Sequence, residues 1–218
     1  MLHALGNGVV AVFSVPGVIA SLCDPVHSMD SRVFPDAHSP VGPTSKIPMS
    51  MITALHVYHI VGFSVSPSDQ FHHCVFVPII ALFGHVMQWG ALRQFLAFFI
   101  CGLPGCIDYA QLCIGSPSTS TTDDARRRLR RKYITMMLNV CLRAPFLCFE
   151  ACLHYVALVH ETTTVHPICN ATIAGLVLFN AMYYTYTSVR SYTLASGGGR
   201  SHVDGAMATT TARCEPRA

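Results

Sequence analysis

The sequence predicts an all-α protein, a polytopic transmembrane helical bundle of about six spans. Three observations lead to this fold class. Of the 218 residues, 51% are hydrophobic and only 11% are charged, whereas about a quarter of the residues in a soluble domain are charged. Several apolar stretches approach the ~20 residues that a helix needs to cross a bilayer. The mean hydropathy of +0.43 points the same way.

The predicted spans cover residues 2–23, 48–65, 70–90, 94–115, 133–159 and 165–189. The first span lacks the basic leader of a signal peptide and its apolar stretch is longer, so we expect it to be retained. Residues 24–47 are rich in proline, aspartate, histidine and serine and are expected to form a loop. A break near residues 89–94 is needed because an unbroken helix there would exceed about 40 residues, too many for one bilayer crossing.

A basic run, "RRRLRRK" at residues 126–132, follows a Ser/Thr/Pro linker at residues 116–124. Because the run lies between apolar spans, we interpret it as a cytosolic loop that obeys the positive-inside rule, and not as a nucleic-acid-binding segment. With this topology, eight lysines and arginines lie near the span ends on the side of the run, against three on the other side. Both termini are therefore predicted to be cytosolic. Residues 1–190 form the transmembrane domain, and the low-complexity residues 191–218 form a disordered cytosolic tail.

The ten cysteines contain no CxxC pair, and most lie inside apolar stretches. We interpret them as small apolar residues. The sequence "NAT" at residues 170–172 fits a glycosylation sequon, but it falls inside the sixth span, so no glycan is expected. We predict no metal site and no cofactor.

The stretch "DQFHH" at residues 69–73 places three ionisable side chains at the start of the third span. On a helix, Asp69 precedes His72 and His73 by three and four positions, so its carboxylate can face either ring. A carboxylate beside an imidazole fixes the tautomer and raises the basicity, as a general base requires. Asp69 can also cap the helix N-terminus, which is compatible with that role. These three residues are the predicted catalytic candidates.

Other polar side chains reach a similar depth from neighbouring spans. His56 and His59 share one face of the second span, and His59 is about 9 Å from its cytosolic end. Ionisable groups at membrane depth usually face a bundle interior or a cavity, so polar groups at one depth predict a shared cavity. The predicted substrate-binding residues are His3, His56, His59, Asp108, Arg143 and Asn180.

The fifth span has one polar face, which falls within an arc of about 60°. The residues of this face are Asn139, Arg143, Glu150 and His154. Arg143 is too far from Glu150 for a comfortable direct pair, so we expect Arg143 to meet Asp108 on the fourth span. Hydrogen bonding between helices and a role in the site are both open for this face.

Two features predict distorted helices. Pro145 should kink the fifth span beside Arg143. The sequence "GLPG" at residues 102–105 should break the fourth span, giving either close helix packing or an unwound segment that lines a cavity.

Together these residues resemble the pattern of the TLC-domain family of multi-pass membrane proteins, which includes the translocating-chain-associating membrane proteins and the ceramide synthases. The resemblance runs in order through "LHALGNGVVAVFSV", "DQFHHCVFVPIIALFG", "LNVCLRAPFLCFE" and "LFNAMYYTYTSVR", and it covers residues 2–190. The paired histidines are its most specific element. Relative to the family, the chain is shortened at its N-terminus. It also has "GLPGCIDY" where most members have an acidic stretch.

The resemblance implies an integral membrane protein of the endoplasmic reticulum or a related endomembrane, with a lipid-facing central cavity. One hypothesis is an enzyme of acyl lipids, such as an acyltransferase that uses acyl-CoA and a histidine base. The second is a non-enzymatic lipid sensor, chaperone or trafficking factor that uses the same cavity. A metal-dependent fatty-acid enzyme is disfavoured because Asp69 stands where "HxxHH" needs its first histidine. A transporter is a further alternative, because intramembrane charges also serve transport.

Overall fold

The computed structural model describes residues 1–35, 41–63, 70, 73, 77–114 and 121–197. These residues form helices and connecting loops, with no β-strand among them. The elements are α1 (Leu2–Cys23), α2 (Ile47–Gly62), α4 (Val77–Val86), α5 (Leu92–Ala97), η2 (Phe98–Gly102), α6 (Leu103–Ile114), α7 (Thr121–Met137), η3 (Leu138–Arg143), α8 (Ala144–Val159) and α9 (Pro167–Gly197). The fold is therefore all-α, as predicted.

Four helices of the described part are long and apolar enough to cross a membrane. They are Leu2–Cys23, Leu92–Ile114, Asp123–Val159 and Pro167–Gly197. The helices at the second and third predicted spans are shorter: α2 has 16 residues and α4 has 10. The structure thus has four helices of membrane-spanning length where about six spans were predicted.

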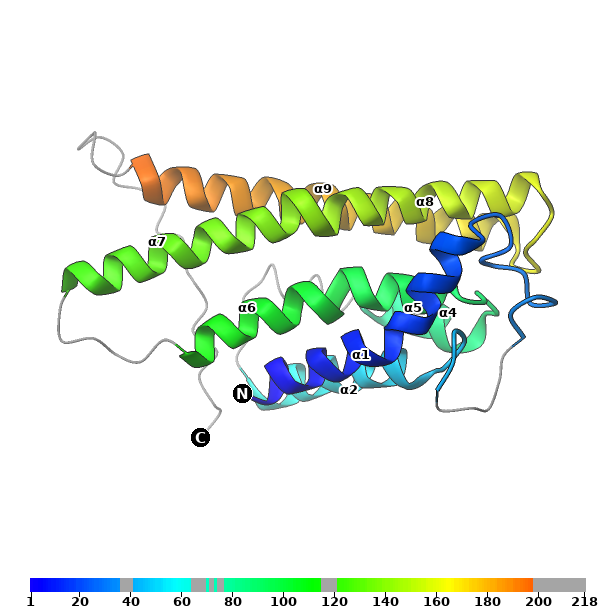
Figure 1. The fold of residues 1–218 in the computed structure, drawn as a ribbon, viewed down its shortest axis with the longest axis horizontal. Coiled ribbons are helices and arrows are strands. Elements are labelled where there is room, and N and C mark those ends of the chain that lie inside the picture. The colour runs from blue at the N-terminus through cyan, green and yellow to red at the C-terminus, as the bar shows by residue number, and fades with distance from the viewer. Residues whose placement is uncertain (36–40, 64–69, 71–72, 74–76, 115–120, 198–218) are drawn as a thin grey trace.

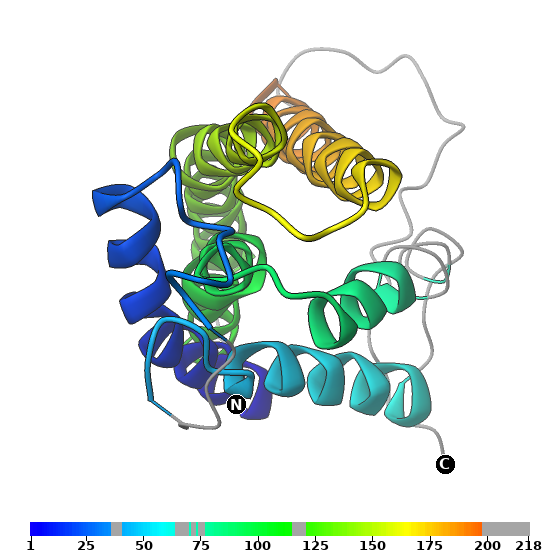
Figure 2. The same cartoon turned by 90° about the vertical axis from the view of Figure 1, so that its right-hand side faces the viewer.

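If α5–η2–α6 and α7–η3–α8 are each taken as one continuous helix, consecutive helices run in alternating directions and their ends gather at two ends of the bundle (Figure 1). At one end the connecting loops bond to each other: the Ala91 N–H donates to the Ser28 carbonyl, and the Thr162 hydroxyl donates to the Val26 carbonyl. At the other end Lys132 of α7 donates to the Ser191 carbonyl of α9. Figure 2 looks along the bundle and shows α1, α2, α4, α8 and α9 arranged around the α5–α6 helix.

Helix α1 is hydrogen-bonded to α5 beside the proline in α1. Pro16 lies inside α1 and has no N–H to donate, and the helix bends midway along its length (Figure 1). The next N–H, that of Gly17, donates to Gln94 Oε1 at 2.8 Å. Gln94 Nε2 in turn donates to the Gly42 carbonyl at 2.6 Å. One fully buried amide therefore joins α1, α5 and the loop before α2.

Two predicted boundaries are wrong. The basic run is helical, because α7 begins at Thr121, whereas the cytosolic position of the run stays a prediction. Its first turn contains Asp123 and Asp124, which stabilise a helix N-terminus, and arginine favours helix. The last helix continues to Gly197, so residues 191–197 do not belong to a disordered tail.

The helix breaks also differ from the prediction. The interruption between α4 and α5 spans residues 87–91, and residues 92–94 are already helical. The "GLPG" sequence does not break its helix, because a π-helical turn, η2, passes directly into α6. There the glycines allow close packing: a Cβ on Gly105 would lie 2.7 Å from Asn7 Nδ2.

A second π-helical turn, η3, ends at Arg143, two residues before Pro145. Proline cannot donate to the carbonyl one turn earlier, and a π-helical turn is one of the ways a helix adapts to such an interruption. The distortion predicted beside Arg143 is therefore present as η3.

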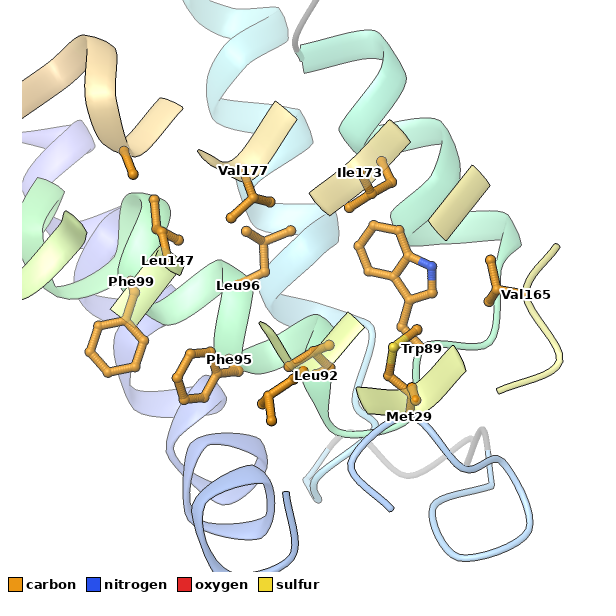
Figure 3. Close-up of a cluster of buried hydrophobic side chains, with 13 residues drawn as sticks. Met29, Trp89, Leu92, Phe95, Leu96, Phe99, Leu147, Val165, Ile173 and Val177 are labelled. Atoms are coloured by element: carbon orange, nitrogen blue, oxygen red, sulfur yellow. The ribbon is translucent and has the colours of Figure 1, made fainter. Parts of the chain in front are cut away.

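The hydrophobic core lies where α5, α8 and α9 meet the loops at one end of the bundle. Figure 3 shows Trp89 packed near Ile173 and Met29. The rings of Phe99 and Phe146 stack at 4.1 Å between centroids and connect η2 to α8. This core holds the helices that carry the candidate site at fixed positions.

Gly17 provides a test of the junction between α1 and α5. A Cβ at this position would lie 2.4 Å from Gln94 Cβ and 2.9 Å from the Ala91 carbonyl oxygen. We expect Gly17→Ala to destabilise the protein by about 1–3 kcal/mol, the usual cost of overpacking. The measurement is unfolding of the purified protein in detergent.

Gly175→Ala is the matched control, because a Cβ at Gly175 meets nothing within 4 Å. Replacing a helical glycine with alanine should leave stability unchanged or raise it by up to about 1 kcal/mol. Equal losses at Gly17 and Gly175 would contradict the packing described for α1.

Candidate functional site

A cavity of about 680 Å³ lies between α1, α2, α4, α6, η3 and α9. One part of its wall is apolar and includes Ile52, Leu55, Ile80, Leu96 and Ile100. The other part is polar and is formed by His3, Asn7, His56, His59, His73, Asp108, Tyr109, Thr135, Asn139, Arg143, Asn180 and Tyr184, together with hydroxyl groups near the end of α9. The cavity is thus amphipathic, which is typical of a ligand-binding site.

The structure brings the predicted site residues together wherever it describes them. His3, His56, His59, Asp108, Arg143 and Asn180, the predicted binding residues, all line this cavity. Of the catalytic candidates, His73 also lines it, whereas Asp69 and His72 lie outside the described residues. The bonding between Asp69 and either ring therefore stays a prediction.

The four histidines that line the cavity, His3, His56, His59 and His73, form a cluster of rings. His59 Nδ1 lies 3.4 Å from His3 Nε2, within hydrogen-bonding distance. The ring of His73 stacks on that of His59 at 5.1 Å and meets that of His56 edge-on at 5.3 Å. The cluster therefore connects His73 to the start of α1 and to the second half of α2.

One tautomer in the cluster is fixed by the backbone. His56 Nδ1 lies 2.8 Å from the Ile52 carbonyl, and a carbonyl oxygen can only accept. Nδ1 of His56 therefore carries the proton, and in the neutral ring Nε2 keeps the lone pair. A histidine oriented in this way can act as a base or accept a hydrogen bond from a ligand. In the described part of the chain, no group of three or more His, Cys, Asp or Glu residues could hold a metal ion.

The expected ion pair between Asp108 and Arg143 is not formed. Arg143 Nη1 donates to Asn139 Oδ1 at 2.9 Å, and its guanidinium lies 5.1 Å from the ring centre of Tyr184. Asp108 instead accepts a hydrogen bond of 2.8 Å from the Thr135 hydroxyl. Each charged group thus has a closer neutral partner. Thr135 and Asn139 supply these partners because they precede Arg143 on the same continuous helix.

The guanidinium of Arg143 is only partly satisfied by protein groups. The residue is 9% exposed, and its Nε has no hydrogen-bond partner among the described residues. A buried cation of this kind favours a negatively charged or strongly polar group nearby. Since Arg143 lines the cavity, a ligand's polar end is a suitable partner.

Some cavity residues escaped prediction, although they lie near residues that were predicted. Asn7 is one turn from His3, Tyr184 is one turn from Asn180, and Tyr109 follows Asp108 directly. Because positions one turn apart share a helix face, a search for polar residues four positions from each candidate would have identified Asn7 and Tyr184. Thr135 lies four positions before Asn139, so the same search extended to the predicted polar face of the fifth span would have identified it too.

The polar face of the fifth predicted span runs along η3 and α8, and the half on α8 lies outside the cavity. Glu150 and His154 are fully buried but do not line it. The His154 ring bonds to Asn170 of α9, whose amide donates to the His154 carbonyl at 2.8 Å. The polar face therefore has two uses, since its first half lines the cavity and its second half joins α8 to α9. Burial of Asn170 also keeps the sequon inaccessible, as expected.

No protein-family model matches the chain, and neither does any curated protein or solved structure. The resemblance to the TLC-domain family therefore stays a prediction from the residues. The function has to be inferred from the chemistry of the cavity.

The contact between Asn139 and Arg143 can be measured by a double-mutant cycle. Asn139→Leu leaves the guanidinium without its closest acceptor, and a hydrogen bond to a charged group is worth about 1.5–3 kcal/mol. We expect this loss of stability in the original protein and a much smaller loss in an Arg143→Met background. The measurement is unfolding in detergent, and additive losses would contradict the contact.

Proposed function

We propose that the protein is a multi-pass endomembrane protein, TLC-like and resident in the endoplasmic reticulum or a related membrane, that binds or processes an acyl lipid in the central cavity. The observation that carries this proposal is the wall of the cavity. Its lining includes both polar side chains, among them the described histidines, Asp108, Arg143 and Asn180, and aliphatic side chains such as Ile52 and Leu96. An acyl lipid likewise combines a polar end with an apolar chain.

The two kinds of lining residue would each contact a different part of such a lipid. Ile52, Leu96 and Ile100 offer an apolar surface for the chain, whose burial is worth about 0.8 kcal/mol per methylene. Arg143 offers a partly unsatisfied cation for a carboxylate, phosphate or carbonyl oxygen. The cavity volume of about 680 Å³ is within the range of roughly 300–1,000 Å³ typical of small-molecule sites.

The histidine cluster distinguishes two versions of this function. In an acyltransferase, one imidazole would remove the proton of an acceptor hydroxyl or amine as it attacks the thioester carbonyl of acyl-CoA, and the thiolate would leave. In a lipid sensor, chaperone or trafficking factor, the same rings would only donate and accept hydrogen bonds. The tautomer of His56, which leaves Nε2 as an acceptor, is compatible with both. Asp69 and His72 remain the proposed companions of His73.

The proposed topology has six spans, with both termini in the cytosol. The basic run lies in α7, Arg190 lies in the last third of α9, and Lys46 is the N-cap of α2. The end of α9 and the start of α7 are at one end of the bundle, and the start of α2 is at the other (Figure 1). This separation agrees with the positive-inside rule. The helix α2, at 16 residues, would be about 24 Å long, so crossing requires residues beyond its C-terminal end or a locally thinned bilayer.

Single cysteines test the topology in a cysteine-depleted background. Val61→Cys at the end of α2 and Asp123→Cys at the start of α7 should react with an impermeant thiol reagent from the cytosol, and Lys46→Cys from the opposite side. All three residues are exposed. Labelling of the cysteines at positions 61 and 46 from the same side would show that α2 does not cross the membrane.

The lipid proposal is tested by mass spectrometry of lipids that copurify with the protein. We expect bound acyl lipid in the original protein and about tenfold less in the His56→Ala, His73→Ala variant, since two lost hydrogen bonds are worth about 1–3 kcal/mol together. Turnover of added acyl-CoA would favour the enzyme, and bound lipid without turnover would favour the binder.

His85→Ala is the matched control. His85 is a half-buried histidine of α4 that contacts Thr53 and does not line the cavity. The His85→Ala variant should copurify with as much lipid as the original protein. An unchanged amount of lipid in the double variant would refute the proposed site. An equal loss of lipid in both variants would show that the loss comes from impaired folding.

A further inference from the structure

Two buried polar side chains of the central cavity have atoms that lack hydrogen-bond partners. Arg143 is 9% exposed and Asn180 is 3% exposed. Among the described residues, Arg143 Nε and Asn180 Oδ1 have no hydrogen-bond partner, and both residues line the cavity. A buried polar atom without a partner is costly. A ligand that bonds to both side chains would therefore be favoured at this place in the cavity.

Hydrogen bonding between α8 and α9 places these two side chains at the same level along the bundle. The Asn170 amide donates to the His154 carbonyl at 2.8 Å, and the two helices run in opposite directions (Figure 1). Arg143 is 11 residues before His154, and Asn180 is 10 residues after Asn170, which corresponds to about 16 Å and about 15 Å of helix. The guanidinium also lies 5.1 Å from the ring centre of Tyr184, one turn from Asn180.

The open edge of the guanidinium has the geometry of a carboxylate site. Arg143 Nη1 donates to Asn139 Oδ1 at 2.9 Å, whereas neither Nε nor Nη2 bonds to a described residue. The N–H groups on this edge are parallel and match the two oxygens of a carboxylate. The Asn180 amide donates to the same carboxylate once it rotates by 180°, which exchanges its oxygen and nitrogen.

The charge of Arg143 is not balanced by a carboxylate of the cavity wall. Among the described lining residues, Asp108 is the only acidic one, and it accepts a hydrogen bond from Thr135. Thr135 precedes Arg143 by eight residues, about 12 Å along the helix. Burying a cation without a counter-charge is costly. An anionic group on the ligand is therefore favoured over an uncharged carbonyl.

The depth of Arg143 distinguishes a fatty acid from ligands whose anionic groups stay at the membrane surface. Arg130 is an exposed arginine of α7, 13 residues before Arg143, about 20 Å along the helix. Half of the hydrocarbon core of a bilayer is about 15 Å thick. If Arg130 lies at the surface of the proposed membrane, Arg143 lies near the bilayer centre. The phosphates of a phospholipid or of acyl-CoA would not reach this depth, whereas a fatty acid fits wholly inside the cavity.

We propose that the ligand of the central cavity is an unesterified long-chain fatty acid whose carboxylate is bound by Arg143 and Asn180. The acyl chain lies along Ile52, Leu55 and Ile80, which line the same cavity. This inference rests on the proposed function, and it narrows the acyl lipid of that function to one with a free carboxylate.

The test compares three tritiated ligands on the full-length protein in lipid nanodiscs: palmitate, its methyl ester and butyrate. Palmitate should bind at least about tenfold more tightly than the ester, because only palmitate offers charged hydrogen bonds to Arg143. Butyrate should bind far more weakly, because it lacks most of the buried chain.

Each other outcome has a distinct meaning. Equal binding of palmitate and its ester would overturn this inference and leave the proposed acyl-lipid function standing. Binding of neither compound would refute the proposed function as well. Binding of butyrate as tight as that of palmitate would assign the site to small carboxylates and would overturn the fatty acid.

Two variants, each verified by thermal unfolding, test the roles of Arg143 and Asn180. Arg143→Met should abolish the preference for palmitate over the ester. Asn180→Asp keeps the shape of the side chain and supplies a carboxylate at the level of the guanidinium. This carboxylate would replace that of the ligand, so palmitate should bind at least about tenfold more weakly. The ester should change less than palmitate in both variants. A preference that both folded variants retain would overturn the inference.

Arg93→Met is the matched control for the loss of a buried arginine. Arg93 is 1% exposed, donates to the Met87 carbonyl at 3.0 Å and does not line the cavity. This variant should keep the preference for palmitate within about twofold. A loss equal to that of Arg143→Met would mean that the preference does not depend on contact with the ligand, and would overturn the site.

Discussion

The energy of a charge at membrane depth is the constraint on which the rest of this structure depends. An arginine at the centre of a spanning helix costs at least about 2.5–3.5 kcal/mol when it faces lipid. Arg143 avoids this cost because it faces inward, where Asn139 accepts its hydrogen bond and the ring of Tyr184 lies against the guanidinium. Once Arg143 faces inward, the orientation of its helix about the helix axis is fixed. The same rotation buries Glu150 and His154.

The other helices obey the same constraint. On α1, Asn7, Ser14 and Ser21 are buried on one face, while Val12 and Ile19 are exposed. Along α1, and along the η3–α8 helix, the polar side chains therefore face the interior, as expected for helices that can cross a membrane. The central cavity lies between several of these polar faces and also has aliphatic lining. Where they do pair, as between His154 and Asn170, the interior is closed.

The sequence predicts the first helix and the set of cavity residues because hydropathy and depth along a helix are local properties. Residues 2–23 were predicted as a span, and α1 is Leu2–Cys23. The partner of Arg143 was predicted wrongly because it depends on side-chain rotamers and on which neighbouring groups offer hydrogen bonds. Asp108 accepts a hydrogen bond from Thr135, and Arg143 donates one to Asn139, so the two charged groups do not pair. The helical structure of the basic run was missed because its composition was interpreted only as a topology signal, although arginines after Asp123 and Asp124 also favour a helix.

Photo-crosslinking with a fatty acid that carries a diazirine in its chain tests the central claim most directly, namely that the interior cavity holds an acyl chain. In membranes containing the full-length protein, we expect adducts on the apolar cavity wall, at Ile52, Ile80 or Leu96. Excess unlabelled fatty acid should compete for these positions. Adducts confined to Val12, Tyr155 and Ile168, which are exposed on the outside of the bundle, would show that the chain does not enter the cavity and would contradict the account.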